Sequence, residues 1–196
     1  MNKKKSIAVA IVLALLLFIG GMLAYFTDID TKTNVFTVGK IDISLNEPNW
    51  DAEDAKDIIP GATIDKDPTV KNESKTNSAY VFVTVTVPAK DASTPFFTYS
   101  KNSAWTEIGT EKYADGKITH VYAYGSNSAM TELETEVSTA AVFNKVTFLS
   151  TLTAADLGTV TSLDIVVNAY GIQTDGVSSV PETLWDLVKG ECSVNI

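Results

Sequence analysis

The side chains that most often perform chemistry in proteins are scarce in this sequence. It contains one histidine, His120, and one cysteine, Cys192. Zinc sites are built mainly from histidine and cysteine, and the sequence has no H-E-x-x-H motif. It also has no G-x-S-x-G motif around a serine and no glycine-rich loop of the kind that binds phosphate. The residues therefore predict no catalytic site and no cofactor, and His120, inside the alternating run KITHVYAY, is predicted to be a strand residue.

Carboxylates are the remaining candidates for metal ligands. The stretch DAEDAKD contains four of them, and oxygen-rich loops bind Ca²⁺ outside cells. This stretch lacks the glycine and the distal glutamate of an EF-hand loop, so a solvated acidic loop is the competing interpretation. The candidate calcium ligands are Asp51, Glu53, Asp54 and Asp57.

The first two dozen residues have the layout of a secretory signal. Three lysines at 3–5 precede an uninterrupted apolar run at 7–19, and Ala24 offers a small residue for a signal peptidase. We expect cleavage between Ala24 and Tyr25. The stretch 7–26 is also about long enough to span the hydrocarbon core of a membrane, so an uncleaved anchor is the alternative.

Charge and length limit the partners of the mature chain. Without residues 1–24 it would keep 12 lysines and 24 acidic residues, a net charge of −12, and the sequence contains no arginine. Nucleic acids and anionic lipids bind clustered positive charge, so neither is predicted as a partner, and membrane contact is expected only through an uncleaved leader. About 170 mature residues suit one domain with one core. Cys192 has no intrachain partner, so an unpaired thiol and a disulfide between two chains both stay open.

The pattern of the mature chain is mostly that of β-strands. Apolar and polar residues alternate, and β-branched and aromatic residues dominate, in five stretches, at 40–47, 79–87, 117–124, 145–152 and 162–173. Turns are predicted at Pro60-Gly61, Asp115-Gly116 and Asp175-Gly176. Helical turns are predicted at 154–158 and, more strongly, at 181–190, where Leu184, Trp185 and Val188 would face inward. The stretch 131–141 suits a strand edge or a short helix.

This pattern predicts an all-β fold. Many short strands, frequent turn signals and few helices are typical of a single antiparallel β-sandwich, and we expect a jelly-roll-like one with short helical insertions. An N-terminal signal helix would precede it. No internal repeat or low-complexity linker divides the chain.

Three stretches resemble the TasA/camelysin family of exported Gram-positive proteins. AYFTD at 24–28 and NVFTVGKIDISLNEPNW at 34–50 are similar to the family's A-[YF]-F-[ST]-D junction and its N-x-F-x-x-G-x-[IL]-D-[IL] strand. The stretch 58–85 is similar to the family's Pro-Gly turn, K-D-P-x-V-x-N strand and aromatic-valine strand. VNAYGIQTDG at 167–176, before a tryptophan-bearing helix, resembles the family's late A-Y-A-I-Q strand. The region 89–160 has no such match.

The resemblance implies a secreted structural protein of the biofilm matrix or cell surface. Members of this family are jelly-roll sandwiches that a dedicated, SipW-type signal peptidase processes, which would suit the large Met22 at the −3 position. TasA-like members polymerise into extracellular fibres, in which the N-terminal segment of one subunit completes a sheet of its neighbour. The camelysin branch is classed as a metallo-endopeptidase without a zinc signature. Because this chain has still fewer ligands, we do not transfer that activity, and a secreted peptidase stays an alternative.

These inferences divide the chain into a signal peptide at 1–24, an N-terminal arm at 25–38 and a β-sandwich domain at 39–196. Cleavage would free the arm, and an exposed sheet edge is a template for another strand. Head-to-tail insertion does not close, so it generates a homopolymer. In the competing interpretations, 36–45 is the first strand of its own sandwich, or the protein is a monomeric surface-binding module. The apolar residues predicted to contact the neighbouring subunit are Tyr25, Phe26, Ile29, Val35, Phe36 and Val38.

Overall fold

The computed structural model describes residues 41–51, 53–54, 59–153, 156 and 163–191. All of them belong to one compact unit that spans Val38–Ile196. The predicted leader, the arm and Cys192 lie outside the described residues. No helix of the described part is both long enough and apolar enough to span a bilayer.

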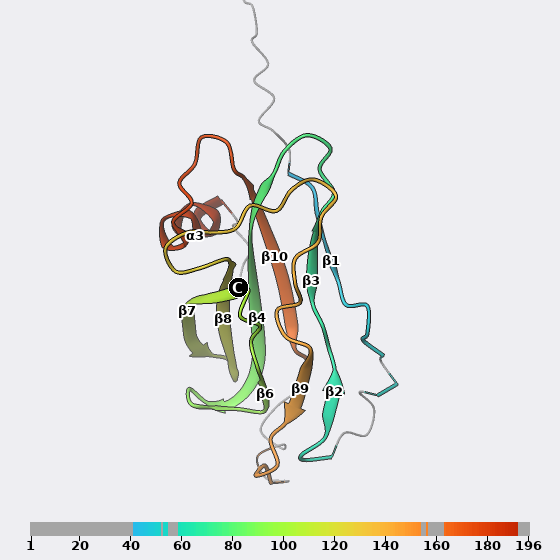
Figure 1. The fold of residues 1–196 in the computed structure, drawn as a ribbon. Coiled ribbons are helices and arrows are strands. Elements are labelled where there is room, and N and C mark those ends of the chain that lie inside the picture. The colour runs from blue at the N-terminus through green and yellow to red at the C-terminus, as the bar shows by residue number, and fades with distance from the viewer. Residues whose placement is uncertain (1–40, 52, 55–58, 154–155, 157–162, 192–196) are drawn as a thin grey trace, which may run out of the picture. The chain divides into compact units, whose positions relative to one another are not determined.

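The first layer is an antiparallel sheet in the order β10-β4-β8-β7 (Figure 1). Its strands are β4 (Ala79–Asp91), β7 (Trp105–Ala114), β8 (Lys117–Tyr124) and β10 (Val166–Gln173), and β5 (Thr94–Pro95) pairs with the end of β4. The β7–β8 hairpin turns at Asp115 and Gly116, both with positive φ, which is the backbone that a two-residue hairpin needs. The turn predicted at Asp115-Gly116 is confirmed.

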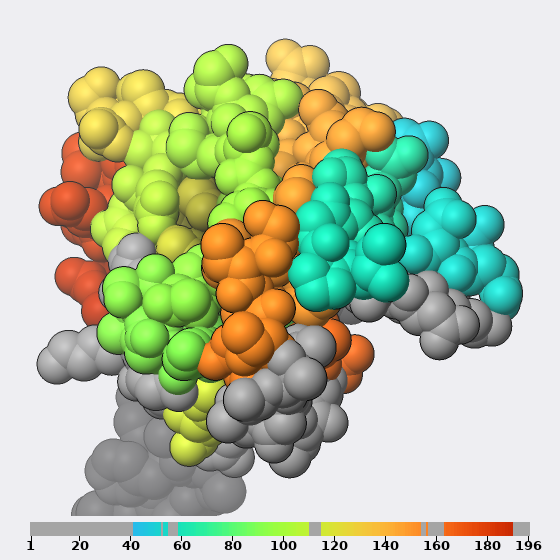
Figure 2. Space-filling view, turned by 90° about the horizontal axis from the view of Figure 1, so that it is seen from below, coloured from blue at the N-terminus to red at the C-terminus, as the bar shows by residue number. Residues whose placement is uncertain are grey.

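The second layer is built on two consecutive strands, β2 (Thr63–Asp65) and β3 (Thr69–Asn72), which pair with antiparallel neighbours. One of these neighbours is β1 (Ile43–Asn46), which pairs with β3. On the other side β9 (Lys145–Phe148) lies between β2 and β6 (Phe97–Tyr99), as Figure 2 shows from below. Segment 137–144 precedes β9 and lies beside β3. The backbone N–H of Thr139 donates to the carbonyl oxygen of Val70 at 2.8 Å, and the backbone N–H of Lys66 donates to the carbonyl oxygen of Asn144 at 3.1 Å.

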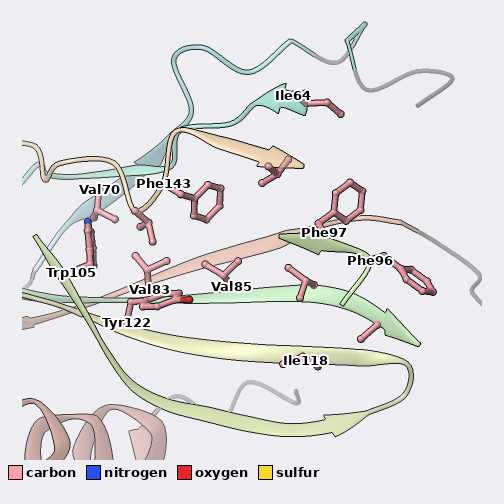
Figure 3. Close-up of a cluster of buried hydrophobic side chains, with 14 of the residues drawn as sticks. Ile64, Val70, Val83, Val85, Phe96, Phe97, Trp105, Ile118, Tyr122 and Phe143 are labelled. Atoms are coloured by element: carbon pink, nitrogen blue, oxygen red, sulfur yellow. The ribbon is translucent and has the colours of Figure 1, made fainter. Parts of the chain in front are cut away.

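The core fills the space between the two layers (Figure 3). Alternate residues of β4 face it, and they are Val81, Val83, Val85 and Val87. Trp105 joins the layers, since its indole Nε1 donates to the carbonyl of Ala140 at 2.9 Å. The molecule is therefore an all-β antiparallel sandwich, as the alternation predicted.

Helix α3 (Pro181–Glu191) covers the outer face of the first layer (Figure 1). Leu184 and Val188 are buried against Tyr80 and Phe82 of β4. The ring of Trp185 lies 5.4 Å from that of Phe82. The inward face predicted for this helix is confirmed, and it explains why both faces of β4 are apolar.

Several boundaries differ from those predicted. Three strands, at 43–46, 145–148 and 166–173, are shorter than the sequence patterns that predicted them. The stretch 131–141 is neither a regular strand nor a helix. It forms isolated bridges to β3 and β4, and Glu136 takes a positive φ that interrupts any longer ladder. Of the short helix predicted at 154–158, only Asp156 is described, and it is helical.

The layers approach each other closely where β1 meets β10. A Cβ on Gly171 of β10 would lie 2.9 Å from Cγ2 of Ile41 and 3.1 Å from Cγ2 of Ile43. The two isoleucines therefore rest on the backbone of β10, and only glycine leaves room for them. This contact is made by side chains, and β1 and β10 form no strand pair.

We predict that Gly171→Val destabilises the domain by about 1–3 kcal/mol, the usual cost of overpacking a well-packed contact. The control is Gly109→Val in β7, where a Cβ would meet nothing within 4 Å. Urea denaturation of both variants measures the difference. Equal midpoints would mean that β1 does not rest on Gly171.

Candidate assembly surface

The outer edge of β10 is a long strand edge that no described strand covers. β10 pairs with β4 on one side and ends the sheet on the other. Its sequence, VVNAYGIQ, contains no charged residue and no proline, although such residues commonly protect edges from further pairing. β7, at the opposite end of this sheet, contains Glu107, Glu111 and Lys112, and its register shifts twice. Of these two edges, that of β10 is the better template for an added strand.

A cavity of about 200 Å³ opens beside the start of β10. Its walls come from both layers, and Figure 3 shows two of the lining residues, Ile64 of β2 and Phe97 of β6. The full lining is Trp50, Ile64, Lys66, Phe97, Val146, Leu163, Asp164 and Ile165.

Segment 47–50, which we call the clasp, folds over Lys66 and Asp67 and forms one wall of this cavity. Lys66 Nζ lies 2.7 Å from Glu47 Oε1 and 4.5 Å from the ring centroid of Trp50. Asn49 donates its backbone N–H and its side-chain Nδ2 to Asp67 at 2.9 and 2.7 Å. Lys66 and Asp67 are each only 6 % exposed, so both buried charges depend on these partners.

We predict that Glu47→Gln costs about 2 kcal/mol of unfolding free energy, because it leaves the buried ammonium of Lys66 without its counter-charge. Glu134→Gln, at an exposed position, is the matched control. Adding Lys66→Met to Glu47→Gln should restore most of the loss, as measured by thermal and urea unfolding. A neutral Glu47→Gln would show that the clasp is not held by this ion pair.

The acidic residues proposed for calcium do not converge. Asp51, Glu53 and Asp54 are exposed, and Asp51 Oδ1 accepts the backbone N–H of Glu53 at 2.9 Å. Asp57 lies outside the described residues. Within the described part, no group of three or more His, Cys, Asp or Glu side chains is placed to hold a metal ion. The predicted cleavage site at Ala24 and Tyr25 and the arm residues also lie outside the described part.

His120 lies in β8, as predicted, and belongs to a polar cluster on the opposite side of the core from β10. Its Nδ1 is 2.8 Å from Glu107 Oε1, and its ring stacks on that of Tyr122. The hydroxyls of Tyr122 and Tyr99 are 2.9 Å apart and join β8 to β6 across the two layers. Burial raises the pKa of Tyr99, and burial likewise raises the pKa of Tyr122, to about 12.

Half of this cluster could be predicted from the sequence. Strand periodicity places His120 and Tyr122 on the same face of β8, two residues apart. Nothing local indicates Tyr99, because it is 23 residues from Tyr122 along the chain. Because the hydroxyl pair of Tyr99 and Tyr122 connects β6 to β8, we interpret the cluster as a link between the layers.

We predict that the free energy of unfolding falls as the pH rises from about 10 to about 12. The tyrosine hydroxyl has a pKa near 10 in the unfolded chain, whereas Tyr122 in the folded chain has a pKa of about 12. Its contribution to stability is therefore complete below pH 10 and is lost as the pH passes 12.

Tyr99→Phe should cost about 1 kcal/mol at neutral pH by leaving the Tyr122 hydroxyl without its partner. Tyr124→Phe is the control. Denaturant titrations at several pH values measure both effects, and a flat profile would contradict the first.

Comparison with known proteins gives one finding. The sequence profile of the camelysin metallo-endopeptidase family matches residues 1–95. The match includes the clasp, β1 to β5 and the predicted leader, and it agrees with the resemblance found in the sequence. No curated protein and no solved structure matches the chain.

Proposed function

Because the chain belongs to the TasA/camelysin family, we propose that it is a secreted structural protein whose copies assemble into extracellular fibres. In each junction, the N-terminal arm of one copy, residues 25–38, adds as a strand to the edge of β10 of the next. A SipW-type signal peptidase releases the arm during export. The product is a head-to-tail homopolymer in the biofilm matrix or at the cell surface.

The observation that carries this proposal is the edge of β10. Eight consecutive uncharged residues end the sheet without a strand partner among the described residues. Strand addition uses the main-chain N–H and C=O groups of such an edge for affinity and side-chain pockets for register. The cavity beside the start of β10 supplies a pocket of this kind.

Chain length supports the same arrangement. A fully extended arm of 14 residues spans up to about 45 Å, whereas the eight residues of β10 span about 27 Å. The arm therefore has enough residues to pair with all of β10 and to keep a short connection to Ile41. In the alternative, 36–45 is the first strand of its own sandwich. Residues 43–45 do lie in β1, and residues 36–40 lie outside the described part, so this alternative stays open.

A metallo-endopeptidase is the second candidate, because the matching family's description names that activity. The described residues do not fit a zinc site, since His120 is paired with Glu107 and the carboxylates near Asp51 do not converge. Casein hydrolysis by the purified mature chain, together with metal analysis, tests this candidate. Chelator-sensitive hydrolysis with stoichiometric metal would favour the peptidase over the fibre subunit.

A monomeric surface-binding module is the third candidate function for this β-sandwich. Size-exclusion chromatography and electron microscopy of the mature chain over several hours separate it from the fibre subunit. A particle that stays monomeric at high concentration would contradict the proposed assembly.

We predict that Asn168→Lys slows fibre growth by about tenfold or more, since one buried lysine at the β10 edge costs at least about 1.4 kcal/mol per junction. Asn168 is exposed on β10, and Asn127→Lys in the loop after β8 is the matched control. Fibre growth is followed by light scattering and electron microscopy. Deleting residues 25–33 should abolish fibre growth, and undiminished fibre growth of that deletion variant would contradict the proposal.

A further inference from the structure

The direction of the chain beside β10 determines where the N-terminal arm leaves the body. Ile41 and Ile43 contact Gly171, near the end of β10. Trp50, which comes later in the chain, lines the cavity beside the start of β10, together with Ile165. The chain from Ile41 to Trp50 therefore runs opposite to β10. The arm precedes Ile41, so it leaves near the end of β10, about 20 Å from the cavity along an extended strand.

An arm that adds to β10 of another copy can run in either of two directions, and the two give different assemblies. A parallel arm brings the end of the acceptor's β10 next to the donor body. The acceptor's own arm leaves from that same end, so the two copies can exchange arms and close as a two-fold dimer. An antiparallel arm brings the start of the acceptor's β10 next to the donor body. The acceptor's arm then leaves on the far side, and the assembly stays open.

We infer that the arm of a second copy adds antiparallel to β10, and that Phe36 of this arm fills the cavity. This inference rests on the proposed function, because an open head-to-tail polymer requires the antiparallel direction. Antiparallel addition also continues the sheet, in which β10, β4, β8 and β7 all pair in this way. The arm residues closest to the donor body then lie at the cavity, and Tyr25 lies toward the other end of β10.

Chain length limits which arm residue can lie at the cavity. If the arm begins at Tyr25 and covers all eight residues of β10, the residue opposite Ile165 is residue 33 or a later one. Phe36 is the only aromatic residue between 33 and 40. With Phe36 opposite Ile165, residues 28–35 pair with β10, and residues 37–40 remain to connect the strand to Ile41 of the donor.

The cavity suits a phenyl ring in size and in lining. Its volume is about 200 Å³, and an apolar cavity of roughly 150 Å³ is enough to bind benzene. Figure 3 shows two of its apolar walls, Ile64 and Phe97, at the same end of the core. Ile165 packs against the core, and directly opposite residues of paired strands face the same side. An arm residue opposite Ile165 therefore points between the layers, where the cavity lies.

The charged residues of the lining do not require a charged ligand. Lys66 is paired with Glu47 of the clasp, and Asp164 also has an interaction of its own. An uncharged ring can therefore enter without replacing a counter-charge.

The arm of the same copy is the competing occupant. Because it leaves near the end of β10, it must reverse its direction before it can pair with its own β10. After that reversal it would run parallel to β10 and bring Tyr25, rather than Phe36, close to the cavity. The parallel two-fold dimer would do the same. The residue found at the cavity therefore distinguishes the inferred junction from both alternatives.

The first experiment locates both ends of the arm. A photo-crosslinking phenylalanine derivative replaces Phe36 in one preparation of unlabelled mature chains and Tyr25 in another. Each preparation is assembled with ¹⁵N-labelled mature chains and irradiated. Residue 36 should crosslink to labelled peptides that contain Trp50 or Leu163–Ile165, and residue 25 to labelled peptides that contain the end of β10. The reverse pattern, crosslinks within one copy only, or crosslinks to other surfaces would overturn the inference.

The second experiment compares seeded fibre growth of two arm variants that lose one apolar side chain each. Phe36→Ser should slow growth about tenfold or more, because the ring no longer leaves water for the cavity. Val35→Ser is the matched control. Its side chain would face the other side of the added strand, so its growth should stay within about twofold of the wild type.

Thermal unfolding of the unassembled chains shows whether Phe36 acts between copies or within one. The inference predicts the same unfolding midpoint for the wild type, Phe36→Ser and Val35→Ser, since the ring is used only in the junction. A midpoint that falls for Phe36→Ser alone would assign Phe36 to the body of its own copy and would overturn the inference.

The outcomes also separate this inference from the proposed function. If fibres grow equally fast from Phe36→Ser and Val35→Ser, or if residue 25 crosslinks to the cavity of a second copy within fibres, the inference is wrong while the fibre proposal stands. If the wild-type mature chain forms only monomers or closed dimers, the proposed function fails and the inference fails with it.

Discussion

The burial of β4 on both faces is the constraint on which the rest of the structure depends. Its valines fill the space between the layers, and its Tyr80 and Phe82 need a second cover on the other face. α3 supplies that cover, which places the helix on the outside of the first layer. β10 and β8 then become the neighbours of β4. In this order β10 is the last strand on its side of β4. No other described strand pairs with it, so its outer edge is free.

The contact at Gly171 determines how the two layers meet. Ile41 and Ile43 press on the β10 backbone with their side chains, so the layers are closed by packing rather than by a ladder of hydrogen bonds. Side-chain closure buries apolar area but leaves the main-chain groups of the β10 edge without a strand partner among the described residues. A barrel closed by strand pairing at this point would have no such edge. The same glycine that lets β1 approach therefore keeps the edge available.

The sequence was informative wherever a local period carries the structure. Alternation identified β4, β8 and β10 and placed His120 in a strand, and the Asp115-Gly116 turn was predicted from its residue types. The clasp and the Tyr99–Tyr122 link were missed because each depends on residues about 20 positions apart, here 19 for Glu47 and Lys66. No period encodes such pairs. The stretch 131–141 failed for a related reason, since it takes its conformation from bridges to β3 and β4 rather than from its own pattern.

Charge favours association at the free edge of β10. The chain has a formal net charge of −9, so copies repel one another over most of their surfaces. The edge of β10 has no charged residue, so contact there adds no charge repulsion from the strand itself, while main-chain groups gain partners. The charged edge of β7 disfavours the same reaction at the other end of the sheet. An acidic body with a long uncharged edge on β10 would therefore favour association at that edge over the charged edge of β7, and a preferred orientation favours a fibre over an amorphous aggregate.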